Sequence, residues 1–255
     1  MIMHISPDAK TLGAAAAKEV ASALRAAIAR DGEARIVLST GESQFTMFEA
    51  LVTQDVEWDK VTMFHLDEYV GISDEHPASF RKYLRERFIE KVGLKNYHFV
   101  DGDPASIPAL TEKLREKPIN VGLIGIGRNG HIAFNDPPAD FDTDEAYIVV
   151  TLDTACRMQQ VAEGWYPTID DVPAQAISMT CSQIMACEKI ISVVPYIEKA
   201  DAVAATLANP VTNLVPATLM KTHADFALYC DADSASKADL ANICMPDGRA
   251  CDICR

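Results

Sequence analysis

One short loop, between Gly125 and Pro137, carries three side chains that together can move protons. Its sequence, GIGRNGHIAFNDP, places an amide at Asn129, an imidazole at His131 and a carboxylate at Asp136. Histidine exchanges protons near neutral pH, and a neighbouring amide or carboxylate can orient its ring and select its tautomer. A lone histidine is more often structural, but glycines let the backbone approach a ligand closely. We therefore interpret this loop as functional.

Two adjacent carboxylates, Asp67 and Glu68, follow the apolar run VTMFHL at 61–66. In an extended chain, one of two neighbours can face a cleft while the other points elsewhere. A carboxylate that is partly desolvated at a strand end gains proton affinity, as a base that removes a proton next to a carbonyl needs. The alternative is that one of the pair caps a helix, which is the commoner use of such residues.

A third motif, Ser-Thr-Gly-Glu-Ser-Gln at 39–44, follows another apolar run. Thr40, Gly41 and Ser43 offer hydroxyls, a permissive backbone and amide groups, which suit a phosphate. An ordinary strand-to-helix turn capped by Ser43 explains the same residues. Glu42 would repel a phosphate unless its carboxylate points away. The lysine of a nucleotide-binding loop is absent, so nucleotide hydrolysis is not indicated.

Apolar runs alternate with helical patterns along the chain, which predicts an α/β fold. We expect a doubly wound, mostly parallel, Rossmann-like sheet with helices on both faces, in one domain over residues 1–255. In such a sheet ligands bind beyond the carboxyl ends of the strands, so the three motifs should converge. Strands are predicted at 34–40, 61–66, 97–100, 119–126, 146–152, 174–180, 189–194 and 226–230, and helices near 7–30, 43–53, 79–92, 104–116 and 197–207, with a short one after 180.

The composition narrows the class of partner. A formal net charge of −14 argues against binding to nucleic acid or to an anionic membrane, so a phosphate would be held by a few placed cations. We see neither a secretory signal nor an apolar run of about 20 residues, and we expect a cytoplasmic protein. The seven cysteines predict no disulfide framework. The segment 244–255 is interpreted as a flexible cysteine-containing tail rather than a zinc site, and no metal is expected.

The chain resembles the glucosamine-6-phosphate deaminase family, which shares its fold with 6-phosphogluconolactonases. The resemblance covers nearly the whole sequence and rests on LDEYVG at 66–71 and GHIAFNDP at 130–137. At these two places the lactonase branch has instead sequences similar to DER and GHTASLFP. The deaminase branch implies conversion of glucosamine 6-phosphate and water to fructose 6-phosphate and ammonia, without a cofactor, by aldose-ketose isomerisation and loss of the amine.

By that resemblance, His131 opens the sugar ring and Asp67 moves a proton between carbons 2 and 1. Asn129 and Asp136 stand where the family usually has an aspartate and a glutamate. An asparagine can accept a hydrogen bond from the imidazole but cannot stabilise imidazolium by charge, and Asp136 is one methylene shorter than the usual residue. Both are carried over as members of the catalytic group.

The same resemblance assigns the residues that bind the substrate phosphate. Lys199 matches the lysine that holds it, although a solvated helix lysine is the plain alternative. Arg157 is the best candidate for the phosphate arginine. The sequence after Pro137 is acidic, so we expect no allosteric amino-sugar-phosphate site. The expected partner is a small phosphosugar, and a homo-oligomer is compatible with the sequence.

Two other functions fit parts of the sequence. A sugar-phosphate lactonase needs only water activation beside a histidine, and rapid lactone hydrolysis without ammonia release would favour it. A non-catalytic sugar-phosphate sensor would bind a phosphosugar without turnover. Because Asp67 and His131 are both present, we prefer catalysis.

Overall fold

The computed structural model describes residues 1–162, 164–246 and 249–254. Within them, eight parallel strands form the main sheet, in the order β11-β1-β10-β9-β6-β2-β3-β5. The chain builds outwards from β2 to β5, returns to β6 beside β2, and then builds in the other direction, so the sheet is doubly wound. These strands are β1 (Ile2–Ser6), β2 (Ala34–Leu38), β3 (Val61–His65), β5 (Asn96–His98), β6 (Val121–Leu123), β9 (Lys189–Val194), β10 (Phe226–Asp231) and β11 (Asp252–Cys254).

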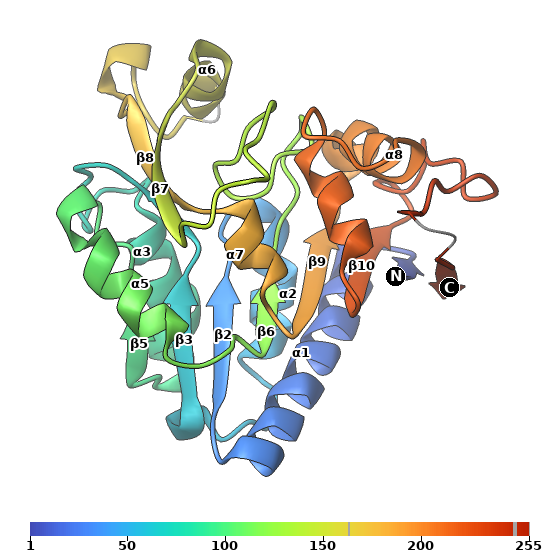
Figure 1. Ribbon diagram of the computed structural model, residues 1–255, viewed down its shortest axis with the longest axis horizontal. Coiled ribbons are helices and arrows are strands. Elements are labelled where there is room, and N and C mark those ends of the chain that lie inside the picture. The colour runs from blue at the N-terminus through green and yellow to red at the C-terminus, as the bar shows by residue number, and fades with distance from the viewer. Residues whose placement is uncertain (163, 247–248, 255) are drawn as a thin grey trace.

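Helices cover both faces of this sheet, which confirms the predicted fold class (Figure 1). Alternate residues of β2 serve the two faces, because Ile36 and Leu38 pack in one apolar cluster and Val37 in the other. The first face carries α1 (Ala9–Asp31), α2 (Phe45–Leu51) and a continuous helix formed by α3 (Phe80–Leu84), a π-helical turn (Arg85–Ile89) and α4 (Glu90–Val92). The second carries α5 (Ile107–Arg115), α7 (Cys181–Met185) and α8 (Ala200–Ala208).

A second, antiparallel sheet projects beyond the carboxyl ends of the main strands together with α6 (Thr154–Ala162) (Figure 1). Its order is β4 (Asp67–Tyr69), β8 (Gln175–Met179) and β7 (Tyr147–Thr151). The sequence predicted the last two strands but placed them in the main sheet, and this placement is corrected. The small sheet has its own aromatic cluster, which includes Tyr69, Phe134 and Tyr166.

Three strands were not predicted from the sequence: β1, β4 and β11. The C-terminal strand pairs in parallel with β1 and opposes Cys254 to His4. Over Asp252–Cys254 this pairing replaces the expected free tail, and it covers an edge that would otherwise expose unpaired backbone groups.

Close packing of α1 on α2 brings the 39–44 loop into place. Gly13 permits it, because a Cβ atom there would lie 2.6 Å from the carbonyl carbon of Thr46. The first helix is bounded by Asp8, whose side chain accepts from the amide of Thr11, and by Gly32 at a φ of 81°. The helix predicted near 7–30 is therefore confirmed.

A buried arginine joins β2 to the end of α5. Arg35 is 5% exposed, and its guanidinium donates to the carbonyls of Leu114 at 3.0 Å, Lys113 at 2.5 Å and Lys117. The carbonyls of Lys113 and Leu114 belong to the last turn of the helix and have no partner within it, and that of Lys117 lies just beyond its end. Arg35 therefore ends α5 and attaches it to the sheet.

Replacing Arg35 with methionine should lower the free energy of unfolding by about 2–4 kcal/mol, because the helix carbonyls lose their buried donors. Urea unfolding followed by circular dichroism measures the change. Arg30→Met is the matched control: Arg30 is exposed and pairs with Asp31 and Glu188, so we expect a loss below about 1 kcal/mol. Equal losses in the two variants would contradict the capping role.

Candidate active site

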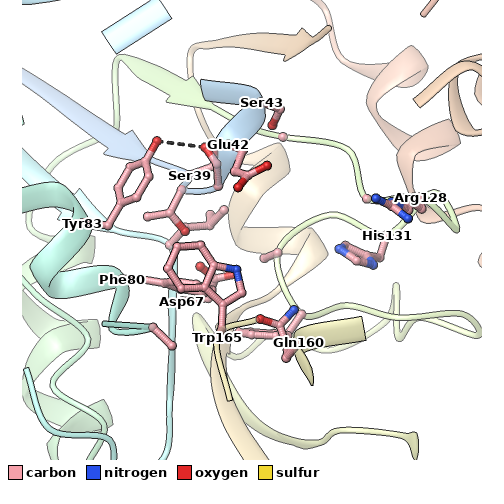
Figure 2. A pocket seen from close by; sticks show the side chains of 18 of the residues that line it. Ser39, Glu42, Ser43, Asp67, Phe80, Tyr83, Arg128, His131, Gln160 and Trp165 are labelled. Carbon is pink, nitrogen blue, oxygen red and sulfur yellow. Dashed lines mark hydrogen bonds between the residues drawn. The ribbon is translucent and has the colours of Figure 1, made fainter. Parts of the chain in front are cut away.

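A cavity of about 490 Å³ opens where the sheet changes direction, between β2 and β6 (Figure 2). Open α/β sheets bind their ligands at this position. The segments that follow β2, β3, β6 and β9 all reach it. Six of the residues predicted from the sequence line the cavity: Thr40, Gly41, Ser43, Asp67, His131 and Lys199.

Asp67 reaches the cavity because it begins β4 rather than a helix. It is 7% exposed, and no protein donor to its carboxylate is found in the described part of the chain. Burial, with the nearby Glu68 carboxylate as a second cause, raises the pKa of Asp67 to about 8. Such a carboxyl group can accept and return a proton near neutral pH.

Glu68 points the other way and caps a helix, so both interpretations of the carboxylate pair apply, one to each residue. Its side chain is fully buried and accepts from the Ser79 hydroxyl at 2.8 Å. It also accepts from the amides of Phe80 at 3.2 Å and Arg81 at 3.0 Å, at the start of α3. Burial raises the pKa of Glu68 despite these hydrogen bonds. The extended backbone of β4 separates the two carboxylates onto opposite faces.

His131 lies over a tight turn of the glycine-rich loop. The amide of Gly127 donates to the carbonyl of His131 at 2.9 Å, and that of Gly130 to the carbonyl of Gly127 at 3.0 Å. A Cβ atom at Gly127 would lie 2.2 Å from the imidazole, so only glycine admits the ring there. Gly130 has a φ of 82°, which glycine adopts readily.

Asp136 is the carboxylate that pairs with the histidine. Its Oδ1 lies 3.0 Å from Nδ1 of His131 and accepts from Nδ2 of Asn129 at 2.9 Å. Burial opposes ionisation of Asp136, but the contacts with His131 and Asn129 outweigh it and lower the pKa of Asp136. Nε2 of the imidazole is thereby left for chemistry in the cavity.

Asn129 does not contact the imidazole, contrary to the expectation from the sequence. Its Oδ1 accepts from the backbone amide of His131 at 3.1 Å, while its Nδ2 holds Asp136. The loop turn, and not residue 129, brings a charge to the ring. Of the two orienting residues that the sequence offered, Asp136 is therefore the one beside the ring.

The 39–44 loop forms the opposite wall of the cavity. Gly41 has a φ of 106°, and its carbonyl accepts from the Tyr83 hydroxyl at 2.9 Å (Figure 2). Gln44 is fully buried and donates through Nε2 to the carbonyl of Val193 at 3.0 Å and to Ser43 Oγ at 3.1 Å. These contacts tie the loop to α3 and to the end of β9.

Two cations and two carboxylates besides Asp67 line the cavity. Lys199 donates through Nζ to the carbonyl of Ile126 at 2.8 Å, and Arg128 extends from the glycine-rich loop. Glu42 and Glu198 line it as well. The local charge is mixed, as the acidic composition of the chain suggested.

Arg157 is not among the residues that line the cavity. Its Nη2 donates to the carbonyl of Ile169 at 2.6 Å and holds the loop after α6. Arg128 is the arginine in the lining. Arg128 was not predicted from the sequence, although its place in the loop that follows β6 was a usable signal. Gln160 and Trp165 also line the cavity and were not predicted (Figure 2).

In the described part of the chain, no group of three or more His, Cys, Asp or Glu side chains has an arrangement that could hold a metal ion. Among the same residues, no helix is long and apolar enough to cross a membrane.

The fold and the cavity place the chain among doubly wound α/β enzymes. Residues 7–228 match the family of glucosamine-6-phosphate isomerases and 6-phosphogluconolactonase. The glucosamine-6-phosphate deaminase of Lacticaseibacillus paracasei is 34% identical over 213 residues, which cover 81% of this chain and 88% of the relative. That of Streptococcus gordonii is 32% identical, with coverage of 82% and 89%. The chain therefore belongs to this family, and the resemblance seen in the sequence is confirmed.

Solved structures agree with this assignment. A monomeric glucosamine-6-phosphate deaminase has a TM-score of 0.83 at 27% identity, over 92% of this chain and 99% of that one. A 6-phosphogluconolactonase from Shewanella baltica has a TM-score of 0.76 at 19% identity, over 91% and 98%. The second likeness concerns the fold alone.

The raised pKa of Asp67 has a consequence for stability. Between pH values of about 4 and 8 the folded protein retains a proton on Asp67 that the unfolded chain has lost, so ionisation disfavours folding as the pH rises. Asp67→Asn removes this cost. We expect the unfolding free energy of the variant, relative to the wild type, to rise with pH by at most about 1.4 kcal/mol per unit in this window. Urea titrations at several pH values measure it, and a constant difference would contradict the assigned environment.

Proposed function

We propose that the protein is an amino-sugar-phosphate isomerase and deaminase, which converts glucosamine 6-phosphate and water to fructose 6-phosphate and ammonia. The buried Asp67 carboxyl at the cavity wall is the observation that carries the proposal, because its pKa of about 8 suits a group that must both take and return a proton. The family and the deaminase relatives at 32–34% identity support it.

His131 begins the reaction by opening the sugar ring. Its imidazole takes the proton of the carbon 1 hydroxyl and a proton passes to the ring oxygen, which gives the open-chain aldehyde. Asp136 at 3.0 Å orients the ring through Nδ1 and stabilises positive charge on it. Gly127 supplies the room that the ring occupies.

Asp67 then moves a proton between neighbouring carbons. The ionised carboxylate removes the proton from carbon 2 while the carbon 1 oxygen takes a proton from the substrate ammonium group, which gives an enolamine. The resulting acid then delivers its proton to carbon 1, which leaves an iminium at carbon 2. Water adds to this iminium, and ammonia leaves as the ketose forms. Asp67 has no competing protein donor among the described residues, so its oxygens are available to the substrate.

The phosphate is placed at the wall formed by Thr40, Gly41 and Ser43, with Lys199 and Arg128 as the cations. Hydroxyls, loop amides and these two charges offer the donors that a phosphate needs. Glu42 opposes it there, and we infer that this carboxylate weakens phosphate binding. Arg157 remains a prediction for this role, and its position outside the lining favours Arg128.

Ammonia release from the purified protein tests the proposal. Glucosamine 6-phosphate and galactosamine 6-phosphate are supplied separately, and the ketose product is identified by NMR. Release from either sugar supports deaminase chemistry and names the epimer. Hydrolysis of a 6-phosphosugar lactone without ammonia release would instead support the lactonase function, and binding without turnover would support a sensor.

Asp67→Asn should lower kcat by about a thousandfold, because the amide cannot carry the proton between carbons 2 and 1. The Kd for fructose 6-phosphate should change by less than about threefold, since the phosphate contacts lie on other segments. Steady-state ammonia assays and calorimetric titration measure the two quantities. A folded variant that no longer binds the phosphosugar would contradict the division of roles.

Glu42→Gln should lower KM for the phosphosugar by about threefold to tenfold, because removal of a nearby carboxylate relieves roughly 1 kcal/mol of repulsion. The matched control is Glu90→Gln, which removes the same charge from an exposed position on α4 outside the cavity. We expect its KM to match that of the wild type. An unchanged KM in Glu42→Gln would show that the phosphate is bound elsewhere.

A further inference from the structure

Strand β8 contacts both β4, which carries Asp67, and the loop that carries His131. Ser178 on β8 takes part in both contacts. Antiparallel pairing of β4 with β8 places Ser178 opposite Asp67. The next amide of β8, that of Met179, donates to the carbonyl of Leu66 at 2.9 Å. The backbone of β8 therefore holds Asp67 and the residue before it.

The side chain of Ser178 holds the histidine loop. Its Oγ accepts from the Phe134 amide at 3.0 Å and donates to the carbonyl of Met179 at 3.1 Å. Asn135 Nδ2 also approaches Oγ at 3.4 Å, although its two hydrogens are directed to nearer carbonyls. The hydroxyl is thus fully used inside the protein, and Ser178 is completely buried. It does not line the cavity, so it cannot touch a ligand there.

Asn135 completes the attachment between the loop and β8. Its Nδ2 donates at 2.8 Å both to the carbonyl of Ile132, within the loop, and to that of Met179, on the strand. These bonds lie between His131 and Asp136 in the chain. They therefore hold the segment that sets the position of the imidazole and of its charged partner.

The segment between His131 and Asp136 contains one residue with an unfavourable backbone conformation. Ala133 has a φ of 52°, in the left-handed region that residues with a Cβ atom rarely adopt. Such a conformation persists when surrounding contacts impose it. The bonds from Phe134 and Asn135 to β8 are the contacts that follow it directly. Their loss would free the loop to relax away from the geometry seen in Figure 2.

We propose that Ser178, together with Asn135, is a positioning residue that sets the imidazole of His131 against the carboxylate of Asp67. The inference rests on the proposed function, in which both groups act on one sugar. One hydroxyl joins the loop that carries the first group to the strand that faces the second. A displacement of about 1 Å between them would cost roughly a hundredfold in rate.

The test compares Ser178→Ala, Ser178→Thr and Ser192→Ala. Threonine keeps the hydroxyl. Ser192 on β9 is the matched control, because it is equally buried. Among the described residues, the one hydrogen-bond partner found for its hydroxyl is Met220 Sδ, at 3.6 Å. Ammonia release gives kcat and KM, and hydrogen exchange followed by NMR reports the Phe134 amide directly.

Ser178→Ala should lower kcat by at least about thirtyfold. KM should stay within about threefold of the wild type, because the 39–44 loop and Lys199 are untouched. Exchange of the Phe134 amide should become about tenfold faster, since it loses its acceptor. Ser178→Thr should recover most of kcat, and Ser192→Ala should match the wild type in all three quantities.

Two results would overturn the proposal: unchanged kcat with unchanged Phe134 exchange in Ser178→Ala, or equal losses in Ser178→Ala and Ser192→Ala. A folded wild-type protein that releases no ammonia contradicts the proposed function instead. In that case the exchange measurement decides alone: faster exchange confined to Ser178→Ala supports the attachment, and unchanged exchange refutes it.

Discussion

The short strand β4 is the constraint on which the rest of the site depends. Two carboxyl groups adjacent in sequence are buried in this strand. Ionising either of them without a partner in the interior would cost free energy. The extended backbone separates them, so that Glu68 satisfies the start of α3 while Asp67 faces the cavity. Burial raises the pKa of both carboxyl groups, that of Asp67 to about 8, and hydrogen bonds oppose the rise at Glu68.

Three sets of contacts fix the segments of the cavity around the Asp67 carboxyl group. Strand β8 pairs with β4, the glycine-rich loop is attached to β8, and the 39–44 loop is tied to α3 and β9. Proton transfer between neighbouring carbons requires such placement, because small errors in position are costly to the rate. The cavity wall carries two basic side chains, Lys199 and Arg128. A chain with a net charge of −14 can therefore still accommodate a phosphorylated sugar there.

The alternation of buried runs with helical patterns predicted six of the eight strands of the main sheet, because parallel strands are apolar on both faces. The convergence of Thr40, Asp67 and His131 followed from that topology. Other features depend on local folding that no periodicity encodes. The turn at Gly127–Gly130 decides that Asp136, and not Asn129, pairs with the histidine. The path of the chain after α6 decides that Arg157 holds a loop while Arg128 lines the cavity. Two of the three residues of β4 are carboxylates, so no apolar run marks it as a strand.

The most direct test of the central claim follows a single proton. Fructose 6-phosphate is incubated in D₂O with ammonium and the protein, and NMR follows the hydrogens on carbon 1. If Asp67 moves the proton between carbons 2 and 1, and the proton held on its carboxyl group exchanges with D₂O between turnovers, the wild type should introduce deuterium at carbon 1 and Asp67→Asn should not. Equal deuterium incorporation by the two proteins would show that another group carries the proton and would contradict the account.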